Sequence, residues 1–156
     1  MGDEDVILQS RDLKSLGPEP LEKDFNEVIF KKIVKSSRGK AKQFLLDQNK
    51  IAGIGNIYAD EILWRVKIHP LRRVETLKDS EIKRLFEFIK RVLTEAVRYR
   101  GTSKTDYRDA YGKKGSYVER LMVYGRRGKK CSRCGNKIER MTIGTRSASF
   151  CSKCQA

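Results

Sequence analysis

Residues 51–70, IAGIGNIYADEILWRVKIHP, place two glycines directly before an apolar, helix-compatible run at residues 57–66. Glycine lets a backbone turn tightly and approach another molecule closely, and Gly53 and Gly55 lie two positions apart. The first N–H groups of a helix have no partner within it, so a turn that ends in a helix start attracts phosphate. The pattern therefore predicts either a backbone-mediated anion site or an ordinary turn that packs two helices together.

Charge is the outlying property of the composition. The 156 residues include 35 Lys and Arg against 20 Asp and Glu, giving a net charge of +15. Such a balance favours a polyanionic partner, most simply nucleic acid, over a basic surface without a specific partner. No apolar run reaches the ~20 residues of a membrane span, and no secretory signal opens the chain. We therefore expect a cytoplasmic protein without membrane contact.

Helical periodicity extends on both sides of the central turn. Asp24 is a candidate cap for a helix that runs to about residue 35, and a second helix is expected at residues 40–47. The strongest helical signal spans residues 78–100, where apolar residues recur three and four apart. Its predicted core stripe comprises Ile82, Leu85, Phe86, Ile89, Leu93 and Ala96. His69, the only histidine, precedes a proline, and we interpret it as a structural turn residue.

Two polar segments flank the helical part. Residues 1–23, with two prolines in LGPEPL, read as a linker or as the end of a preceding part of a longer protein. Residues 102–117 are polar and long for a plain connection. Long ordered loops often serve a function, and disorder is the alternative. The sequence thus divides into a linker at 1–23, a helical domain at 24–124 and a final module at 125–156.

The four cysteines form two Cys-x2-Cys pairs near the end of the chain: Cys131, Cys134, Cys151 and Cys154. Residues 138–143 and 147–150 are rich in β-formers and flank a turn at residues 144–145, which predicts a hairpin that brings the pairs together. Four clustered cysteines in a basic chain without a secretory signal favour a metal over disulfides. Four thiolates favour one structural Zn2+ over a rubredoxin-like iron site. Because so small a module cannot bury a core, the metal would supply its folding energy.

Arg146 lies at the end of this predicted hairpin turn. A guanidinium on a rigid turn can bind a phosphate with two hydrogen bonds or enter a minor groove. The alternative is an arginine that is only solvated.

Taken together, GIGNIYADEILW with the following HP, VYGRRGKKCSRCG and FCSKCQ resemble the C-terminal half of formamidopyrimidine-DNA glycosylases. These enzymes are related to endonuclease VIII and act in base-excision repair. The resemblance covers about residues 16–155. It implies a mainly α fold, in which a helical helix–two-turns–helix domain is followed by a small four-cysteine zinc-ribbon β-hairpin. It also implies a monomer, located in the cytoplasm with the nucleoid, that binds double-stranded DNA carrying a damaged base or an abasic site.

The resemblance assigns roles to individual residues. Asn56 would bind a phosphate beside the extruded nucleotide, with the Gly55 backbone close to it. Lys42 would also meet the phosphate backbone, and Arg146 would clamp the same region from the zinc finger. The segment that closes over an extruded oxidised purine would include Thr102, Ser103, Tyr107 and Tyr117. In this interpretation these groups position the DNA and do not read its sequence.

In one respect the chain departs from the family pattern. Family members begin, after removal of methionine, with a nucleophilic proline and a glutamate that serves as acid or base. Here Gly2 is the second residue, and the N-terminal β-sandwich half of the family is absent from this sequence. We therefore assign no catalytic residue and expect the chain to need a catalytic half to excise a base.

Three hypotheses follow. The first is the damaged-DNA-binding half of a bifunctional DNA glycosylase/AP lyase that excises oxidised purines such as formamidopyrimidine and 8-oxoguanine. The second is a stand-alone, non-enzymatic zinc-ribbon protein that binds nucleic acid, including RNA. The third is a self-sufficient enzyme that uses its own N-terminal amine or a lysine as nucleophile. Preference for an abasic or bent duplex over plain duplex would separate the first from the second.

Overall fold

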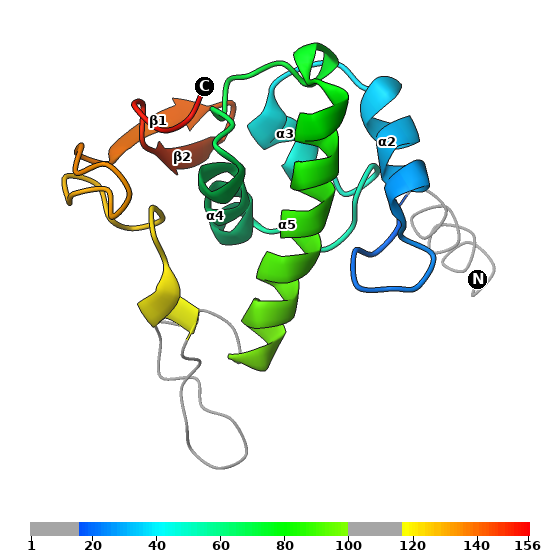
Figure 1. Cartoon of the computed structure of the whole chain (residues 1–156), viewed down its shortest axis with the longest axis horizontal. Coiled ribbons are helices and arrows are strands. Elements are labelled where there is room, and N and C mark those ends of the chain that lie inside the picture. Colours follow the sequence, from blue (N-terminus) through cyan, green and yellow to red (C-terminus); the bar gives the residue numbers. More distant parts are fainter. Residues whose placement is uncertain (1–15, 100–116) are drawn as a thin grey trace, which may run out of the picture.

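Helix α4, Asn56–Val66, lies at the centre of the fold, between helix α5, Asp79–Arg98, and a two-stranded hairpin (Figure 1). The computed structural model describes residues 16–99 and 117–156. Two shorter helices, α2 and α3, complete the helical body. The remaining bounds are α2 Glu27–Lys35, α3 Ala41–Leu46, and the 3-10 helices η1 Val74–Thr76 and η2 Tyr117–Arg120. The prediction of a mainly helical fold that ends in a small hairpin is confirmed.

Helix α2 begins later than the sequence predicts. Its N-cap is Asn26, whose side-chain oxygen accepts the N–H of Ile29 at 2.9 Å. The prediction of Asp24 as the cap is therefore wrong by two residues. Asparagine and aspartate cap helices by the same hydrogen bond, so composition alone does not separate the two positions.

Helix α5 confirms the predicted core stripe. Its N-terminus is closed by Glu81, whose Oε1 accepts the N–H of Lys78 at 2.9 Å. The stripe faces the core, where Phe86 is partly buried and the other predicted side chains are buried: Ile82, Leu85, Ile89, Leu93 and Ala96. Val92, which the prediction did not include, is buried beside them. Burial of such a stripe against neighbouring helices supplies most of the stability of an amphipathic helix.

Part of the predicted linker packs against the turn that precedes α4. Gly17 donates to the carbonyl of Gln48 at 2.8 Å, and the carbonyl of Pro18 accepts the N–H of Ala52 at 3.0 Å. A Cβ at Gly17 would lie 2.2 Å from the Lys50 carbonyl oxygen, so only glycine fits there. The predicted domain boundaries at residues 24 and 125 stay predictions.

The hairpin consists of β1, Glu139–Ile143, and β2, Arg146–Phe150, paired antiparallel with Ile143 opposite Arg146. Its turn contains Gly144 at φ 63°, a conformation that favours glycine. Strand β2 packs on α4, with Ala148 and Phe150 buried. The predicted hairpin is confirmed.

The end of the chain is attached to the end of α4. The Ala156 carbonyl accepts the N–H of His69 at 3.0 Å, and Gln155 donates from Nε2 to the Ile68 carbonyl at 2.9 Å. The His69 ring packs edge-on against Phe150, and its Nδ1 accepts the N–H of Leu71 at 3.0 Å. These contacts confirm His69 as a structural turn residue.

Apolar side chains form two clusters in the described part of the chain. The larger fills the helical body, and Phe25, Phe30 and Phe44 contribute aromatic contacts to it. The smaller joins Trp64 to the C-terminal module. None of the helices in residues 16–99 and 117–156 is both long enough and apolar enough to cross a membrane.

Candidate nucleic-acid interface

The turn before α4 is held by a side chain that the sequence did not single out. Gln48 accepts the N–H of Gly53 through Oε1 at 2.7 Å and donates from Nε2 to the Ile54 carbonyl at 3.2 Å. Gly53 has φ 92°, which side-chain-bearing residues rarely adopt. The Gly-x-Gly pattern predicted a tight turn, but nothing in the pattern identified the amide that fixes it.

The N-terminus of α4 is left without a side-chain cap. Its N-cap is Gly55, with φ −90° and ψ 175°, a conformation open to any residue. A Cβ at Gly55 would meet nothing within 4 Å. Neither backbone conformation nor packing within the described residues therefore requires glycine here. A glycine at such a position lets an external group approach the backbone N–H groups and the positive end of the helix dipole closely.

A groove of about 540 Å³ opens in front of this helix end. Asn56 and Arg146, far apart in sequence, both line it. The Asn56 Oδ1 atom is buried and has no hydrogen-bond partner among the described residues. The other lining residues are Gln43, Leu46, Asp47, Gln48, Ile54, Gly55, Ile143 and Thr145. The structure thus brings together three of the four predicted DNA-binding residues.

The groove offers donors rather than catalytic groups. An asparagine amide and an arginine guanidinium supply side-chain donors, and the α4 N-terminus supplies backbone N–H groups. The acidic lining residue, Asp47, already accepts the N–H of Asn49 at 3.0 Å. This combination suits an oxyanion such as a phosphate and positions it without reading a base.

Lys42 does not line the groove, which corrects its predicted contact with phosphate. Its side chain is 0% exposed and forms an ion pair with Asp60. Its Nζ also donates to the carbonyl of Ser147 at 3.0 Å. Burial lowers the pKa of Lys42, Asp60 opposes that shift, and the nearby positive charge of Arg146 adds to it. Lys42 therefore joins α3, α4 and β2 inside the protein.

Asp60 and Glu61 are adjacent carboxylates of α4 and are both fully buried. Asp60 accepts the N–H of Ser149 through Oδ2 at 3.1 Å. Burial raises the pKa of Asp60 to about 6, and the Lys42 ammonium opposes the shift. Both residues fall within the run at residues 57–66 that the sequence pattern indicated as apolar. The available signal was the presence of two consecutive acids in a helix whose neighbouring residues are apolar. Buried charges need partners, so such acids indicate contacts inside the protein.

Glu61 binds the segment that leads into the C-terminal module. Its carboxylate accepts three consecutive backbone N–H groups, from Met122 at 2.7 Å and from Val123 and Tyr124 at 2.9 Å each. Burial raises the pKa of Glu61, and these three hydrogen bonds oppose the shift. The two carboxylates thus attach both the entry to the module and strand β2 to α4.

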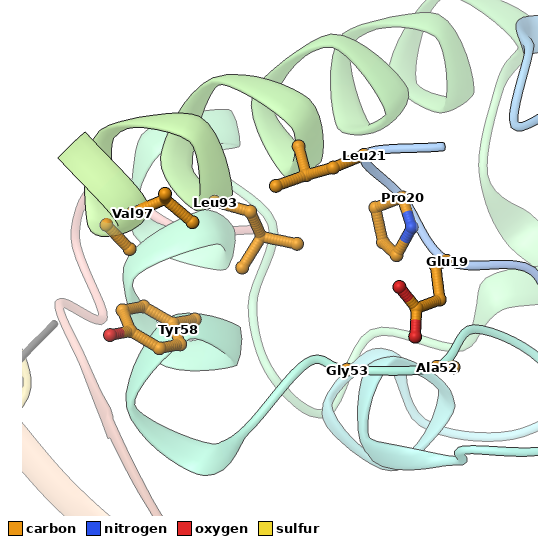
Figure 2. Close-up of a pocket in the computed structure, with 9 residues that line it drawn as sticks. Glu19, Pro20, Leu21, Ala52, Gly53, Tyr58, Leu93 and Val97 are labelled. Carbon is orange, nitrogen blue, oxygen red and sulfur yellow. The ribbon is translucent and has the colours of Figure 1, made fainter. Parts of the chain in front are cut away.

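A second pocket, of about 350 Å³, lies on another side of the same turn (Figure 2). Its walls are mainly apolar, and Tyr58, Leu93 and Val97 form one side of it. The carboxylate of Glu19 points toward the backbone at Ala52 and Gly53 (Figure 2). An apolar pocket with a carboxylate repels phosphate, so we assign the DNA backbone to the groove of Asn56 and Arg146.

Most of the predicted lesion loop, including Thr102, Ser103 and Tyr107, lies outside the described residues. Tyr117 is described, and its side chain is fully buried, with its ring 5.7 Å from that of Tyr58. Burial raises the pKa of Tyr117 to about 12. The side chain therefore packs in the helical body rather than on a surface loop.

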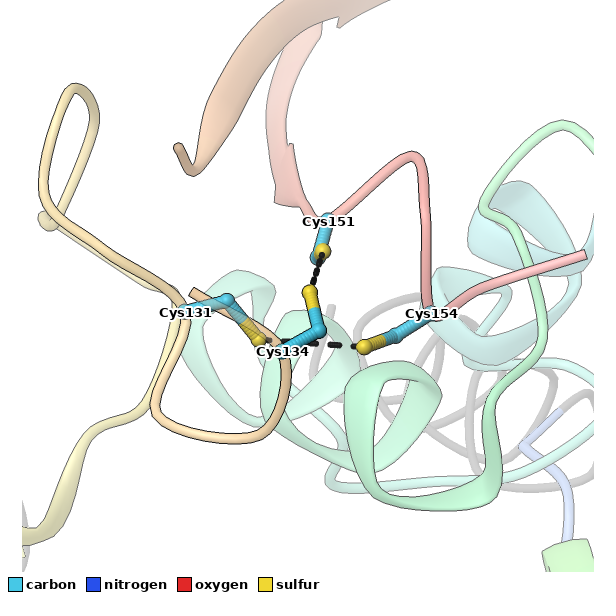
Figure 3. Close-up of side chains that lie close together, drawn as sticks. All are labelled: Cys131, Cys134, Cys151 and Cys154. Carbon is cyan, nitrogen blue, oxygen red and sulfur yellow. Dashed lines mark hydrogen bonds between the residues drawn. The ribbon is translucent and has the colours of Figure 1, made fainter. Parts of the chain in front are cut away.

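The four cysteine sulfurs gather at one point (Figure 3), with all Sγ atoms within 4.8 Å of one another. The Cys131–Cys154 and Cys134–Cys151 sulfurs are 3.8 and 3.4 Å apart. A disulfide would need about 2.05 Å. Four thiolates tetrahedrally bound to zinc at ~2.3 Å would lie roughly 3.8 Å apart. The cysteines therefore fit a closed zinc site and do not form disulfides.

Trp64 connects this cysteine cluster to α4. Its Nε1–H donates to the Cys131 sulfur at 3.4 Å, and Arg133 stacks on its ring at 3.9 Å. Partners of this kind orient a metal ligand from outside the coordination sphere. This contact was not predictable from the sequence, because nothing in the spacing relates residue 64 to residue 131.

Both parts of the chain match known protein families. Residues 16–108 match the family model "Formamidopyrimidine-DNA glycosylase H2TH domain", and residues 128–156 match "Zinc finger found in FPG and IleRS". Formamidopyrimidine-DNA glycosylase from Herpetosiphon aurantiacus is 50% identical over 141 residues, which are 90% of this chain and 52% of that protein. The Heliobacterium modesticaldum protein of the same name is 48% identical over 140 residues, 90% and 50% of the two chains.

Solved structures give the same result. The Lactococcus lactis Fpg in complex with DNA containing an abasic site superposes with a TM-score of 0.86 at 40% identity, covering 97% of this chain and 55% of that one. The Thermus thermophilus MutM (Fpg) protein superposes with a TM-score of 0.85 at 41% identity, covering 90% and 54%. The chain spans about half the length of the curated relatives it matches. By sequence and by fold, it belongs to the formamidopyrimidine-DNA glycosylase helix–two-turns–helix (H2TH) family.

Proposed function

We propose that this chain holds damaged double-stranded DNA for a DNA glycosylase/AP lyase that excises oxidised purines in base-excision repair. The groove of Asn56 and Arg146 binds backbone phosphate next to the lesion. The catalytic steps require groups that we assign to no residue of the described ranges. The chain acts as a monomer, located in the cytoplasm with the nucleoid.

The observation that carries this proposal is the shared groove. An uncapped helix end, the side-chain amide of Asn56, which can donate through its Nδ2 group, and the guanidinium of Arg146 line one groove, and together they suit an oxyanion. The net charge of +15 favours a polyanion. The similar Lactococcus lactis Fpg structures contain DNA with an abasic site or a Fapy-dG lesion, which supports damaged DNA as the ligand here.

One structural Zn2+ is part of the proposal. It would be held by the four clustered cysteines and would supply folding energy rather than chemistry, because four protein thiolates leave no open position for a substrate. Its role is to give Arg146 a rigid support.

Asn56→Ala tests the groove directly. We expect affinity for a duplex with one abasic site to fall by about 1–3 kcal/mol, because a hydrogen bond to a charged phosphate is lost. Binding would be measured by fluorescence anisotropy at fixed salt. Asn49→Ala is the matched control, since Asn49 is exposed and does not line the groove. Equal affinities of wild type, Asn49→Ala and Asn56→Ala would remove Asn56 from the interface.

A further inference from the structure

We propose that the buried Lys42–Asp60 pair is a positioning device for Arg146. It fixes strand β2 on helix α4, so that the guanidinium lines the groove beside Asn56. The inference rests on the proposed phosphate-binding role of that groove. It replaces a direct contact between Lys42 and phosphate, which the burial of Lys42 rules out.

Each member of the pair binds one main-chain group of β2. Lys42 Nζ donates to the Ser147 carbonyl at 3.0 Å, and Asp60 Oδ2 accepts the N–H of Ser149 at 3.1 Å. Ser147 directly follows Arg146. Residues two apart in a strand present their main-chain groups on the same edge, so two such bonds fix the strand along its length. The two side chains together specify where β2 lies on α4.

Among the described residues, no other hydrogen bond attaches the Arg146 end of β2 to the helical body. In residues 16–99 and 117–156, these two bonds are the hydrogen bonds that connect residues 144–149 to the helical body. The cysteines and the Gln155 contact with Ile68 act beyond the opposite end of β2. The metal site alone therefore leaves the turn and Arg146 without a polar attachment.

The attraction between the two charges is a weak reason for a charged pair at this position. Apolar residues of similar volume are often as stabilising as a buried ion pair, because desolvation of the charges offsets their attraction. Apolar residues cannot, however, donate to one main-chain group of a strand and accept from another. The pair supplies this donor and this acceptor, and so fixes the position of β2 on α4.

Asp60→Asn and Arg146→Ala form a double-mutant cycle that tests the inference. Lys42 and Ser149 donate to different oxygens of Asp60, and asparagine replaces one of those oxygens with an NH2 group that cannot accept, so one of the two bonds is lost. We expect Asp60→Asn to bind an abasic duplex about tenfold more weakly, the size of one lost charge-assisted hydrogen bond. It should also lower the salt slope by about one counterion. Asp60→Asn removes a negative charge, which by itself would strengthen binding to DNA. The expected weakening is therefore opposite to the effect of charge alone.

The outcomes separate the inference from the proposed function. If Asp60 acts through Arg146, the double variant binds no more weakly than Arg146→Ala alone. Losses that add, or wild-type binding by Asp60→Asn, would overturn the inference and leave the groove intact. Wild-type affinity and salt slope for Arg146→Ala would overturn the phosphate role of Arg146, and the inference with it.

A second variant tests whether the pair positions β2 or is needed only for the chain to fold. In Lys42→Met/Asp60→Leu neither charge of the pair remains, and the Ser147 carbonyl and the Ser149 N–H lose their partners. The chain should keep its zinc and stay folded with a lowered urea midpoint, and binding is measured without urea, where zinc content and circular dichroism match wild type. Its affinity for the abasic duplex should still fall about tenfold, because β2 has lost both attachments. Lys35→Met/Asp79→Leu, which likewise removes one charge of each sign but from an exposed ion pair, is the control for charge. Wild-type binding by the folded double variant would refute the positioning role.

Discussion

Replacing Cys134 with serine is expected to unfold the C-terminal module and to abolish DNA binding, while helices α2 to α5 stay folded. Cys134 contributes one of the four clustered sulfurs, and a structural zinc supplies on the order of 10 kcal/mol of folding energy to a small domain. The smaller apolar cluster contains Cys131 and Cys151, so it cannot persist without the metal site. Arg146 then loses its support. The larger cluster lies in the helical body and keeps its own core.

Trp64 provides the readout. It is the only tryptophan of the chain, and its Nε1–H donates to the Cys131 sulfur at 3.4 Å. Cys134→Ser should shift its emission toward that of a solvent-exposed indole, with zinc content near zero and helical circular dichroism largely kept. Ser132→Ala, within the same Cys-x2-Cys loop, is the control and should behave like wild type. Full zinc content together with wild-type Trp64 emission in Cys134→Ser would contradict the four-thiolate site.

Replacing Glu61 with leucine is expected to have the second largest effect. The carboxylate is fully buried and accepts three backbone N–H groups from Met122, Val123 and Tyr124. Leucine has a similar size but accepts none of them, and each buried donor left unsatisfied costs ~1–3 kcal/mol. We expect the free energy of unfolding to fall by about 3 kcal/mol or more in urea titrations with excess zinc.

Two controls show whether that loss comes from the hydrogen bonds. Glu61→Gln keeps one acceptor oxygen, so its stability should lie between those of wild type and Glu61→Leu. Glu119→Leu removes an exposed glutamate of η2 and should change the free energy of unfolding by less than about 0.5 kcal/mol. Equal stability of Glu61→Leu and wild type would show that water satisfies residues 122–124 without Glu61.

Local patterns were enough to predict the main helices, the hairpin and the clustering of the four cysteines. The stripe of α5 repeats at helical spacing over many residues, and the two Cys-x2-Cys pairs flank a run of β-formers with a glycine turn. Each of these signals depends only on neighbours in sequence. The same is true of the turn before α4, where Gly53 adopts a left-handed conformation. Asn56 and Arg146 were brought into one prediction only by the resemblance to a family.

Long-range pairing was not predictable in this way. Lys42 looks like any surface lysine of a short helix, and its burial depends on Asp60 and on β2, which follow much later in the chain. Trp64 meets Cys131 for the same reason. Buried charges need partners, but a single sequence does not say which partners the fold supplies. The resemblance assigned Lys42 to phosphate, whereas the structure gives that lysine a partner inside the protein.

The most direct test of the account is a comparison of two duplexes of identical sequence, one with a single abasic site and one intact, bound by the purified chain at the same salt concentration. If the groove of Asn56 and Arg146 holds the backbone beside a lesion, the abasic duplex should bind about tenfold more tightly, because a flexible, unstacked site is easier to bend and open. Equal affinity for the abasic duplex, the intact duplex and an RNA of the same length would contradict it. That result would instead favour a zinc-ribbon protein that binds nucleic acid through charge alone.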